Sequence, residues 1–148
     1  GGFPRKAPFG PARSSTRAMA LADFNGDGRL DIAACHEEQG LFIYFSRGKG
    51  AFSPGFKVAG GEAEPYSMTA ADLNKDGKPD IIIGYVNAPG AIYFNQGDGR
   101  DYDRLSFGDS LGAVYGLAAA DFDGDGYPDL VAARSDAPSI LFFNRPGR

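Results

Sequence analysis

A nine-residue acidic pattern occurs three times in the chain, and it has the composition of a calcium-binding loop. The pattern is Asp-x-Asn/Asp-x-Asp-Gly-x-x-Asp, and its copies begin at Asp23, Asp72 and Asp121, 49 residues apart. Side-chain oxygens at alternate positions are ligands that Ca²⁺ prefers, and the glycine at position six permits a sharp turn around an ion. The sequence therefore predicts three Ca²⁺ sites per chain.

Each loop is expected to supply side-chain oxygens from positions one, three, five and nine, and the backbone carbonyl of position seven. The ligand sets are Asp23, Asn25, Asp27, Arg29 and Asp31 in the first loop, Asp72, Asn74, Asp76, Lys78 and Asp80 in the second, and Asp121, Asp123, Asp125, Tyr127 and Asp129 in the third. We expect the ions to stabilise the fold rather than to catalyse a reaction, because each ion would tie two strands together.

Two other interpretations fit part of the loop pattern. An EF-hand loop begins in the same way but requires a glutamate at position twelve and a helix on each side. Position twelve is Ala34, Ile83 and Ala132, which argues against an EF-hand in all three copies. Asp, Asn and Gly also form ordinary hairpin turns. The loops hold ten of the 19 acidic residues, and carboxylates this close would repel one another without a cation.

The segments around each loop have the pattern of short β-strands. A run of small and apolar residues precedes the loop, a compact apolar run follows it, and a third run rich in aromatic and branched residues comes after a polar break. These runs are 18–22, 32–35 and 41–45 in the first repeat, 67–71, 81–85 and 91–94 in the second, and 116–120, 130–133 and 140–143 in the third. A weaker fourth strand is expected around Phe52 and Phe56, and around Tyr102 and Phe107.

Four short antiparallel strands in a repeat of this length are typical of a β-propeller blade. We therefore predict an all-β fold, a β-propeller with three four-stranded blades in a single repeat domain. The blades span residues 13–60, 61–110 and 111–148, and the third lacks its fourth strand.

Residues 1–12 resemble a fourth strand with no three strands before it. On the 49-residue frame Phe3 aligns with Phe52, and Phe9-Gly10 resembles Phe107-Gly108. We expect this segment to complete the third blade, either of its own chain or of a partner. Two chains would then form a six-bladed homodimer, within the usual range of blade numbers. The alternative is that the chain is a fragment of a larger adhesion-type propeller.

With its loops and its strand pattern, the chain resembles FG-GAP and VCBS repeats, the calcium-binding blades of the integrin α-chain propeller and of many secreted proteins. Phe9-Gly10 and Phe107-Gly108 match the Phe-Gly half of the name, but no clear Gly-Ala-Pro half is present. The resemblance implies a propeller with an extracellular role, secreted, periplasmic or on a cell surface, in adhesion, ligand binding or scaffolding. Some members of the family are glycan-binding lectins.

Composition excludes several classes of function. The chain has 148 residues and a net charge of -4, the wrong sign for a protein that binds nucleic acid backbones. No apolar run approaches the roughly 20 residues that a membrane-spanning helix requires, so no membrane insertion is expected. The single cysteine, Cys35, aligns with Gly84 and Ala133, which indicates a small-residue position in a sheet rather than a reactive thiol.

One sequence feature suggests an esterase. Ser110 lies in Gly-Asp-Ser-Leu-Gly, which resembles the signature of a family of serine esterases. A nucleophile elbow needs a strand-to-helix turn and a histidine base downstream, whereas the only histidine, His36, lies upstream. We therefore expect an ordinary inter-blade loop at Ser110, and no enzyme. His36 itself is expected to be a solvated residue in a polar break.

The loops at the end opposite the calcium loops differ most among the repeats. They carry stacking and hydrogen-bonding groups that glycans or peptides use, namely Glu37, Tyr66, Asn87, Tyr115, Arg134 and Asp136. Neutral drift would explain the same variation. The sequence thus favours a non-enzymatic, calcium-stabilised module for recognition or assembly, with a glycan-binding lectin as the alternative.

Overall fold

A computed structural model describes residues 2, 5–61 and 63–145. These residues form thirteen β-strands and no helix, so the predicted all-β fold class is confirmed. Every strand pair is antiparallel. Among the described residues there is no helix that is long and apolar enough to cross a membrane.

The strands form three main sheets, one for each repeat. The first sheet has the order β1 (Thr16–Ala22), β2 (Asp31–His36), β3 (Gly40–Tyr44) and β6 (Phe56–Ala59). The second has the order β7 (Pro65–Ala71), β8 (Asp80–Tyr85), β9 (Gly90–Asn95) and β10 (Tyr102–Phe107). The third contains β11 (Ala113–Ala120), β12 (Asp129–Ser135) and β13 (Ile140–Phe142).

The fourth strand of the first sheet differs in detail from the sequence expectation. Phe56 begins β6, but Phe52 lies in a separate hairpin formed by β4 (Ser46–Gly48) and β5 (Ala51–Phe52). Ser53, Pro54 and Gly55 separate the two segments, and proline cannot donate a backbone hydrogen bond to a strand ladder. The aromatic residues therefore occupy two elements instead of one.

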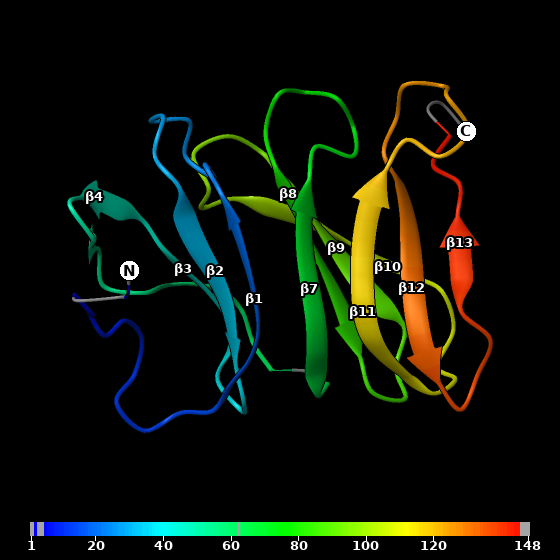
Figure 1. Cartoon of the computed structure of the whole chain (residues 1–148), viewed down its shortest axis with the longest axis horizontal. Coiled ribbons are helices and arrows are strands. Elements are labelled where there is room, and N and C mark those ends of the chain that lie inside the picture. The colour runs from blue at the N-terminus through cyan, green and yellow to red at the C-terminus, as the bar shows by residue number, and fades with distance from the viewer. Residues whose placement is uncertain (1, 3–4, 62, 146–148) are drawn as a thin grey trace.

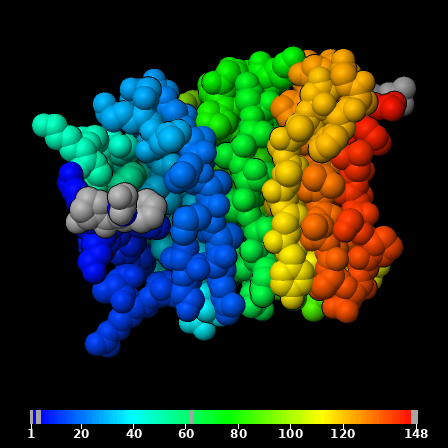
Figure 2. Space-filling view, viewed as in Figure 1, coloured from blue at the N-terminus to red at the C-terminus, as the bar shows by residue number. Residues whose placement is uncertain are grey.

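The three sheets lie side by side, with their first strands as neighbours. Strands β1, β7 and β11 run next to one another, and the remaining strands of each sheet extend behind them (Figure 1). The same order is visible as blue, green and yellow-to-red bands in Figure 2. The loops that join the first and second strands of each sheet all lie at one end of the molecule (Figure 1). Tandem repetition therefore places the three acidic loops at the same end.

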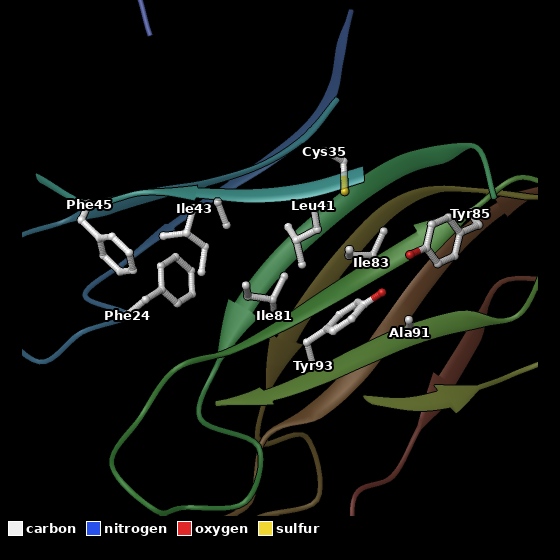
Figure 3. Packing of buried hydrophobic residues seen from close by; sticks show 11 residues of the cluster. Phe24, Cys35, Leu41, Ile43, Phe45, Ile81, Ile83, Tyr85, Ala91 and Tyr93 are labelled. Carbon is white, nitrogen blue, oxygen red and sulfur yellow. The ribbon is translucent and has the colours of Figure 1, made fainter. Parts of the chain in front are cut away.

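The core lies between adjacent sheets. In β8, Ile81 and Ile83 pack against the first sheet, in a cluster that includes Leu41 and Ile43 (Figure 3). Ile82 belongs to a second cluster with Leu130 of the third sheet. The middle sheet is therefore apolar on both faces, which explains why β8 is a continuous apolar run rather than an alternating one.

The segment of residues 5–12, which we call the N-terminal segment, contains no strand. It lies against the first sheet, where the ring of Phe9 is 5.6 Å from that of Tyr44 and 6.4 Å from that of Phe52. Arg5 donates a hydrogen bond of 2.8 Å to the backbone carbonyl of Lys49. Residues 1, 3 and 4, which belong to the strand expected over 1–12, lie outside the described residues.

Candidate functional site: three acidic loops and the opposite end

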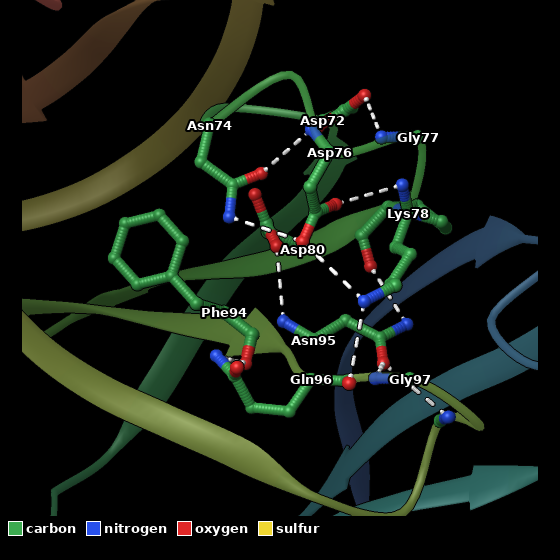
Figure 4. Close-up of polar contacts among 12 residues, drawn as sticks. Asp72, Asn74, Asp76, Gly77, Lys78, Asp80, Phe94, Asn95, Gln96 and Gly97 are labelled. Atoms are coloured by element: carbon green, nitrogen blue, oxygen red, sulfur yellow. Dashed lines mark hydrogen bonds and ion pairs between the residues drawn. The ribbon is translucent and has the colours of Figure 1, made fainter. Parts of the chain in front are cut away.

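In the second acidic loop, backbone N–H groups fix the side chains of the expected calcium ligands (Figure 4). Asp72 accepts hydrogen bonds from the amides of Asp76, at 3.1 Å, and Gly77, at 2.9 Å. Asn74 Oδ1 also accepts from the amide of Asp76, and Asp76 Oδ1 accepts from that of Lys78. The loop folds around its own side-chain oxygens, and this orients the carboxylates.

The first loop repeats this geometry closely. Asp23 accepts hydrogen bonds from the amides of Asp27, at 3.0 Å, and Gly28, at 2.7 Å. The third loop differs by one residue, because Asp121 Oδ1 accepts from the amide of Gly124 at 2.7 Å, while its Oδ2 accepts from that of Gly126 at 2.9 Å. Position one thus has the same structural role in all three loops.

The glycine at position six has the conformation that the sequence pattern requires. Gly28, Gly77 and Gly126 have φ angles of +82°, +84° and +91°, a region that residues with a side chain rarely adopt. A sharp turn at this point brings position nine back beside position one. The predicted turn is confirmed.

The aspartates at position nine have a structural role that sequence reasoning missed. Asp80 is fully buried and accepts two hydrogen bonds, from the amide of Leu73 at 2.8 Å and from that of Asn95 at 3.0 Å. Asp31 and Asp129 make the equivalent pairs of hydrogen bonds in the other two loops. Each of these carboxylates therefore joins its loop to the chain at the end of the third strand, as for Asn95, or two residues after it, as for Ser46 and Asn144.

The surroundings of two position-nine aspartates, Asp80 and Asp31, raise the pKa values of their carboxyl groups. Burial raises the pKa of Asp80 to about 6, against the opposing effect of the two amide donors, and the neighbouring Asp76 and Asp72 add to the rise. Burial likewise raises the pKa of Asp31. A nearby cation would favour the ionised form of both carboxylates.

The third loop provides the clearest test of whether these oxygens fit one ion. Asp121, Asp123 and Asp129 each have a ligand atom, and the three atoms lie within 4.8 Å of one another. Oxygens bound to Ca²⁺ lie about 2.3–2.6 Å from the ion, so two of them can be separated by up to about 5 Å. The donor chemistry and the spacing of these side chains fit a calcium ion.

A basic side chain lies beside position five in two of the loops. Arg29 Nη2 is 2.7 Å from Asp27 Oδ2, and Lys78 Nζ is 3.6 Å from Asp76 Oδ2. In the third loop the corresponding residue is Tyr127, and position three is the acidic Asp123 instead of an asparagine. The third loop therefore has the largest excess of negative charge.

At the opposite end, each first strand begins with the same irregularity. The register shifts between Thr16 and Ala18, between Pro65 and Ser67, and between Val114 and Gly116. The residues inside these shifts, at equivalent positions of the repeat, are Arg17, Tyr66 and Tyr115. A register shift of this kind is a β-bulge, which changes the direction in which the side chain of the extra residue points.

These three residues make two sets of contacts, one between the two tyrosines and one between Arg17 and two acidic residues. The rings of Tyr66 and Tyr115 meet edge to face with centroids 4.5 Å apart. Arg17 forms an ion pair with Glu37 at 2.8 Å and lies 3.6 Å from Glu64. Tyr66, Tyr115 and Glu37 were candidates from the sequence, whereas Arg17 and Glu64 were not.

The other three sequence candidates at this end have local structural roles. Asn87 and Asp136 have φ angles of +49° and +57°, as does Glu38 at +63° in the equivalent turn of the first sheet. Asn and Asp tolerate this left-handed conformation better than most residues. Arg134 is held by Asp109 at 2.6 Å and by the carbonyl of Pro138 at 2.7 Å, and its side chain is largely buried.

The expectation that His36 is solvated is wrong. His36 ends β2 and is only 1% exposed, because its ring packs against Phe42 and Tyr44. Its Nε2 lies 2.7 Å from the hydroxyl of Tyr44, and its Nδ1 lies 3.0 Å from that of Thr16. Burial lowers the pKa of His36.

The expectation for Cys35 is confirmed. The side chain is buried in the core between the first and second sheets, and burial raises the pKa of its thiol to about 12. A thiol with so high a pKa is a poor nucleophile at neutral pH.

Ser110 lies in the exposed loop between β10 and β11. The next element in the chain is the strand β11, so the strand–turn–helix geometry of a nucleophile elbow is not formed at this serine.

Comparison with protein families gives two overlapping matches. A family model described as FG-GAP-like repeat matches residues 23–83 and residues 72–132. Each match begins at the first aspartate of an acidic loop and extends into the second strand of the next sheet. No curated protein sequence matches the chain.

Proposed function

Because the chain belongs to the FG-GAP-like repeat family, we propose that it is a calcium-stabilised, non-enzymatic β-propeller module for recognition or assembly. The observation that carries this proposal is the threefold repetition of an oxygen-lined loop at one end of three adjacent antiparallel sheets (Figure 1). In this proposal each sheet is a propeller blade, and β1, β7 and β11 face the propeller axis.

Calcium would be held by the side-chain oxygens and position-seven carbonyls of the three loops. When bound, the ion supplies positive charge that offsets repulsion among the carboxylates. The residues of the chain position the ligand groups. The loop amides orient the carboxylates at positions one and five, and the buried aspartate at position nine joins the loop to the end of the third strand.

Recognition is proposed for the end that carries Tyr66, Tyr115, Arg17 and Glu37. A glycan is the favoured ligand class, because aromatic rings can stack on the apolar face of a sugar while charged side chains bond to its hydroxyl groups. The observation that favours this candidate is the partly exposed pair of tyrosine rings beside an ion pair. A protein or peptide ligand is the alternative.

We further propose an extracellular setting, secreted or on a cell surface. Extracellular modules bind calcium with dissociation constants of roughly 10⁻⁴–10⁻³ M, which millimolar external calcium satisfies. A chain that is part of a larger adhesion-type propeller would have the same calcium requirement.

Calorimetric titration with Ca²⁺ tests the stabilising role. We expect three ions per chain, and two after Asp125→Ala, with Asp103→Ala as the control for loss of an exposed acid outside the loops. A melting temperature that does not change between calcium and EGTA contradicts the proposal.

Glycan-array binding tests the recognition end. We expect Tyr66→Ala and Tyr115→Ala to abolish any signal, and Leu105→Ala, which removes an exposed apolar side chain of β10, to preserve it. Equal loss in all three variants would argue against a site at Tyr66 and Tyr115.

A further inference from the structure

The two outermost sheets each leave one apolar face open. On the first sheet, Met19 and Leu21 of β1 are 51% and 58% exposed. On the third sheet, Phe122, Leu141 and Phe143 are exposed. The two sheets lie at opposite ends of the row in Figure 1. Exposed large apolar side chains that gather on one face mark a surface for contact with another protein segment.

The open faces are the two halves of an interface that the chain already builds between its own sheets. Phe122, Leu141 and Phe143 correspond, 98 residues earlier, to Phe24, Ile43 and Phe45, which are buried against the second sheet. Met19 and Leu21 correspond, 49 residues later, to Met68 and Ala70, which pack on the other side of that same interface. The open face of the third sheet is therefore complementary to the open face of the first sheet.

The N-terminal segment occupies the position of a fourth strand from a preceding blade. Phe9 packs edge-on against Tyr44, with centroids 5.6 Å apart, and Phe107 of β10 packs edge-on against Phe142 of the third sheet, at 5.3 Å. Phe9 and Phe107 are 98 residues apart, and so are Tyr44 and Phe142. The same contact is therefore made at two equivalent places, once by a strand and once by the N-terminal segment.

The following glycines extend this equivalence. Gly10 has a φ of +80° and Gly108 a φ of +72°. A Cβ on Gly10 would lie 3.2 Å from the ring of His36 and 3.5 Å from the hydroxyl of Tyr44. A Cβ on Gly108 would lie 3.2 Å from the ring of Phe142, which is the equivalent of Tyr44. Both positions require close approach of the backbone to an aromatic ring of the next sheet.

Among the described residues, the N-terminal segment has no strand partner and the third sheet has no fourth strand. Residues 5–12 pair with no strand of the described chain, and the third sheet ends at β13, whose outer edge is unpaired there. A hollow of about 610 Å³ also lies between the N-terminal segment and the first sheet, lined by Phe9, Phe42, Tyr44 and Phe52 among others. The hollow provides room for apolar side chains of a neighbouring blade.

We propose that a second copy of this chain closes the ring, and that the N-terminal segment of each copy is the fourth strand of the third sheet of the other. The register follows from β10 and β9, where Phe107 is opposite Gly90 and Leu105 is opposite Ile92. By the repeat, Phe9 lies opposite Ser139, and Ala7 lies opposite Leu141. The proline at position 8 is compatible with this pairing, since a fourth strand is the edge of its sheet.

The proposed dimer has two identical junctions and six four-stranded sheets, within the usual range for closed propellers. It rests on the propeller arrangement of the proposed function but not on the calcium sites or a ligand. If no dimer is found, calorimetry is still expected to give three Ca²⁺ ions per chain. If calorimetry does not give three ions, the particle is still expected to have the mass of a dimer in a buffer in which the chain is folded.

The mass of the particle in calcium buffer is the first test. Sedimentation analysis is expected to give twice the 15.6 kDa of one chain. Leu21→Asp and Phe143→Asp each place a carboxylate in both junctions, and each is expected to raise the dimer dissociation constant at least tenfold. Leu111→Asp, an exposed apolar residue in the loop before β11, is the matched control and is expected to remain dimeric.

Mixing the two interface variants tests the geometry. A mixed dimer has one junction with no substitution and one junction with both, so an equimolar mixture is expected to form dimers at concentrations where either variant alone is monomeric. The double variant Ala7→Cys/Leu141→Cys is expected to give an oxidised covalent dimer, whereas Lys6→Cys/Leu141→Cys, whose side chains lie on opposite faces, is not.

A monomeric wild-type chain overturns the proposal. A dimer that survives deletion of residues 5–12 overturns the strand exchange, as does failure of the Ala7→Cys/Leu141→Cys variant to crosslink. Absence of dimers in the mixture of Leu21→Asp and Phe143→Asp overturns the pairing of the two open faces.

Discussion

At the residue scale, the acidic loops combine two kinds of aspartate that the sequence pattern does not distinguish. Asp76, at position five, is exposed and accepts one backbone hydrogen bond from within its own loop. Asp80, at position nine, is fully buried and links two separate segments. A loss of calcium affinity is therefore expected from substitution of either residue, but a loss of intrinsic stability mainly from substitution of Asp80.

Asp80→Ala is expected to destabilise the protein even in EGTA. The substitution leaves the amides of Leu73 and Asn95 buried without an acceptor, and each unsatisfied group costs about 1–3 kcal/mol. Asp76→Ala is the control, because its effect should be visible in calcium and small in EGTA. Urea denaturation of both variants with and without calcium measures the difference. Equal stability of the two variants in EGTA would show that position nine has no role beyond the ion.

His36 is expected to make stability depend on pH. Its pKa is lowered by burial from an ordinary value of 6.5, so the unfolded chain binds a proton that the folded chain excludes. Its contribution to stability is therefore fully present above about pH 6.5 and is lost as the pH falls toward the lower pKa of the folded state. Both ring nitrogens face hydroxyl groups, of Tyr44 and Thr16, which do not compensate the charge.

The measurement is the free energy of unfolding at pH 7.5 and pH 5.5, compared between the wild-type protein and His36→Gln. The variant is expected to lose less stability over this interval, by at most about 1.4 kcal/mol, because the interval extends only one pH unit below the ordinary pKa of 6.5. The carboxylates titrate in both proteins and cancel in the comparison. Identical pH dependence would contradict the assignment.

At the element scale, the sequence pattern was sufficient to predict the repeated strands and the turn at each loop glycine, because both depend on local residue types. It was insufficient for the turns between the second and third strands of each sheet. There Glu38, Asn87 and Asp136, which occupy equivalent positions of the repeat, adopt the same left-handed conformation. The backbone is therefore the same in the three turns although their residues differ. Asn87 and Asp136 were candidates for ligand binding, yet the turn alone accounts for an asparagine and an aspartate at these positions.

The burial of His36 could not be predicted for a related reason. It depends on Tyr44, eight residues away, and on the N-terminal segment, whose Gly10 lies against its ring. The alternation of residues along a strand reveals which side chains share a face, but not whether another segment covers that face. Similarly, the buried carboxylate of Asp80 depends on Asn95, which lies 15 residues away.

Glu38→Asn is therefore expected to stabilise the protein. Glu38 has a φ of +63°, a conformation that costs roughly 1–2 kcal/mol for residues other than glycine and is better tolerated by asparagine. A gain of about 0.5–1 kcal/mol in urea denaturation is expected. The reciprocal change Asn87→Glu, in the equivalent turn of the second sheet, is expected to cost a similar amount. A loss of stability in Glu38→Asn, or a gain in Asn87→Glu, would contradict this explanation.

At the scale of the whole molecule, one hydrogen bond crosses each interface between adjacent sheets beside the acidic loops. Asn95 Nδ2 donates to the carbonyl of Phe24 at 2.8 Å, and Asn144 Nδ2 donates to that of Leu73 at 2.7 Å. In the repeat, Ser46, which begins β4 just after the third strand of the first sheet, is the equivalent of these asparagines. Its backbone amide likewise donates to the position-nine aspartate, Asp31. The acceptor that Ser46 would face in the proposed dimer is the carbonyl of the partner's Phe122.

Ser46→Asn is therefore expected to strengthen the dimer, because serine is too short to span the distance that asparagine spans at the two interfaces within the chain. One hydrogen bond contributes about 0.5–1.5 kcal/mol net, and the dimer has two junctions, so the dissociation constant is expected to fall about tenfold or more. Sedimentation at several concentrations measures this. Ser46→Ala, which adds no donor, is the control and should not tighten the dimer. A Ser46→Asn variant that stays folded but dimerises no more tightly than the wild-type chain would mean that the first and third sheets do not meet as adjacent sheets do within the chain.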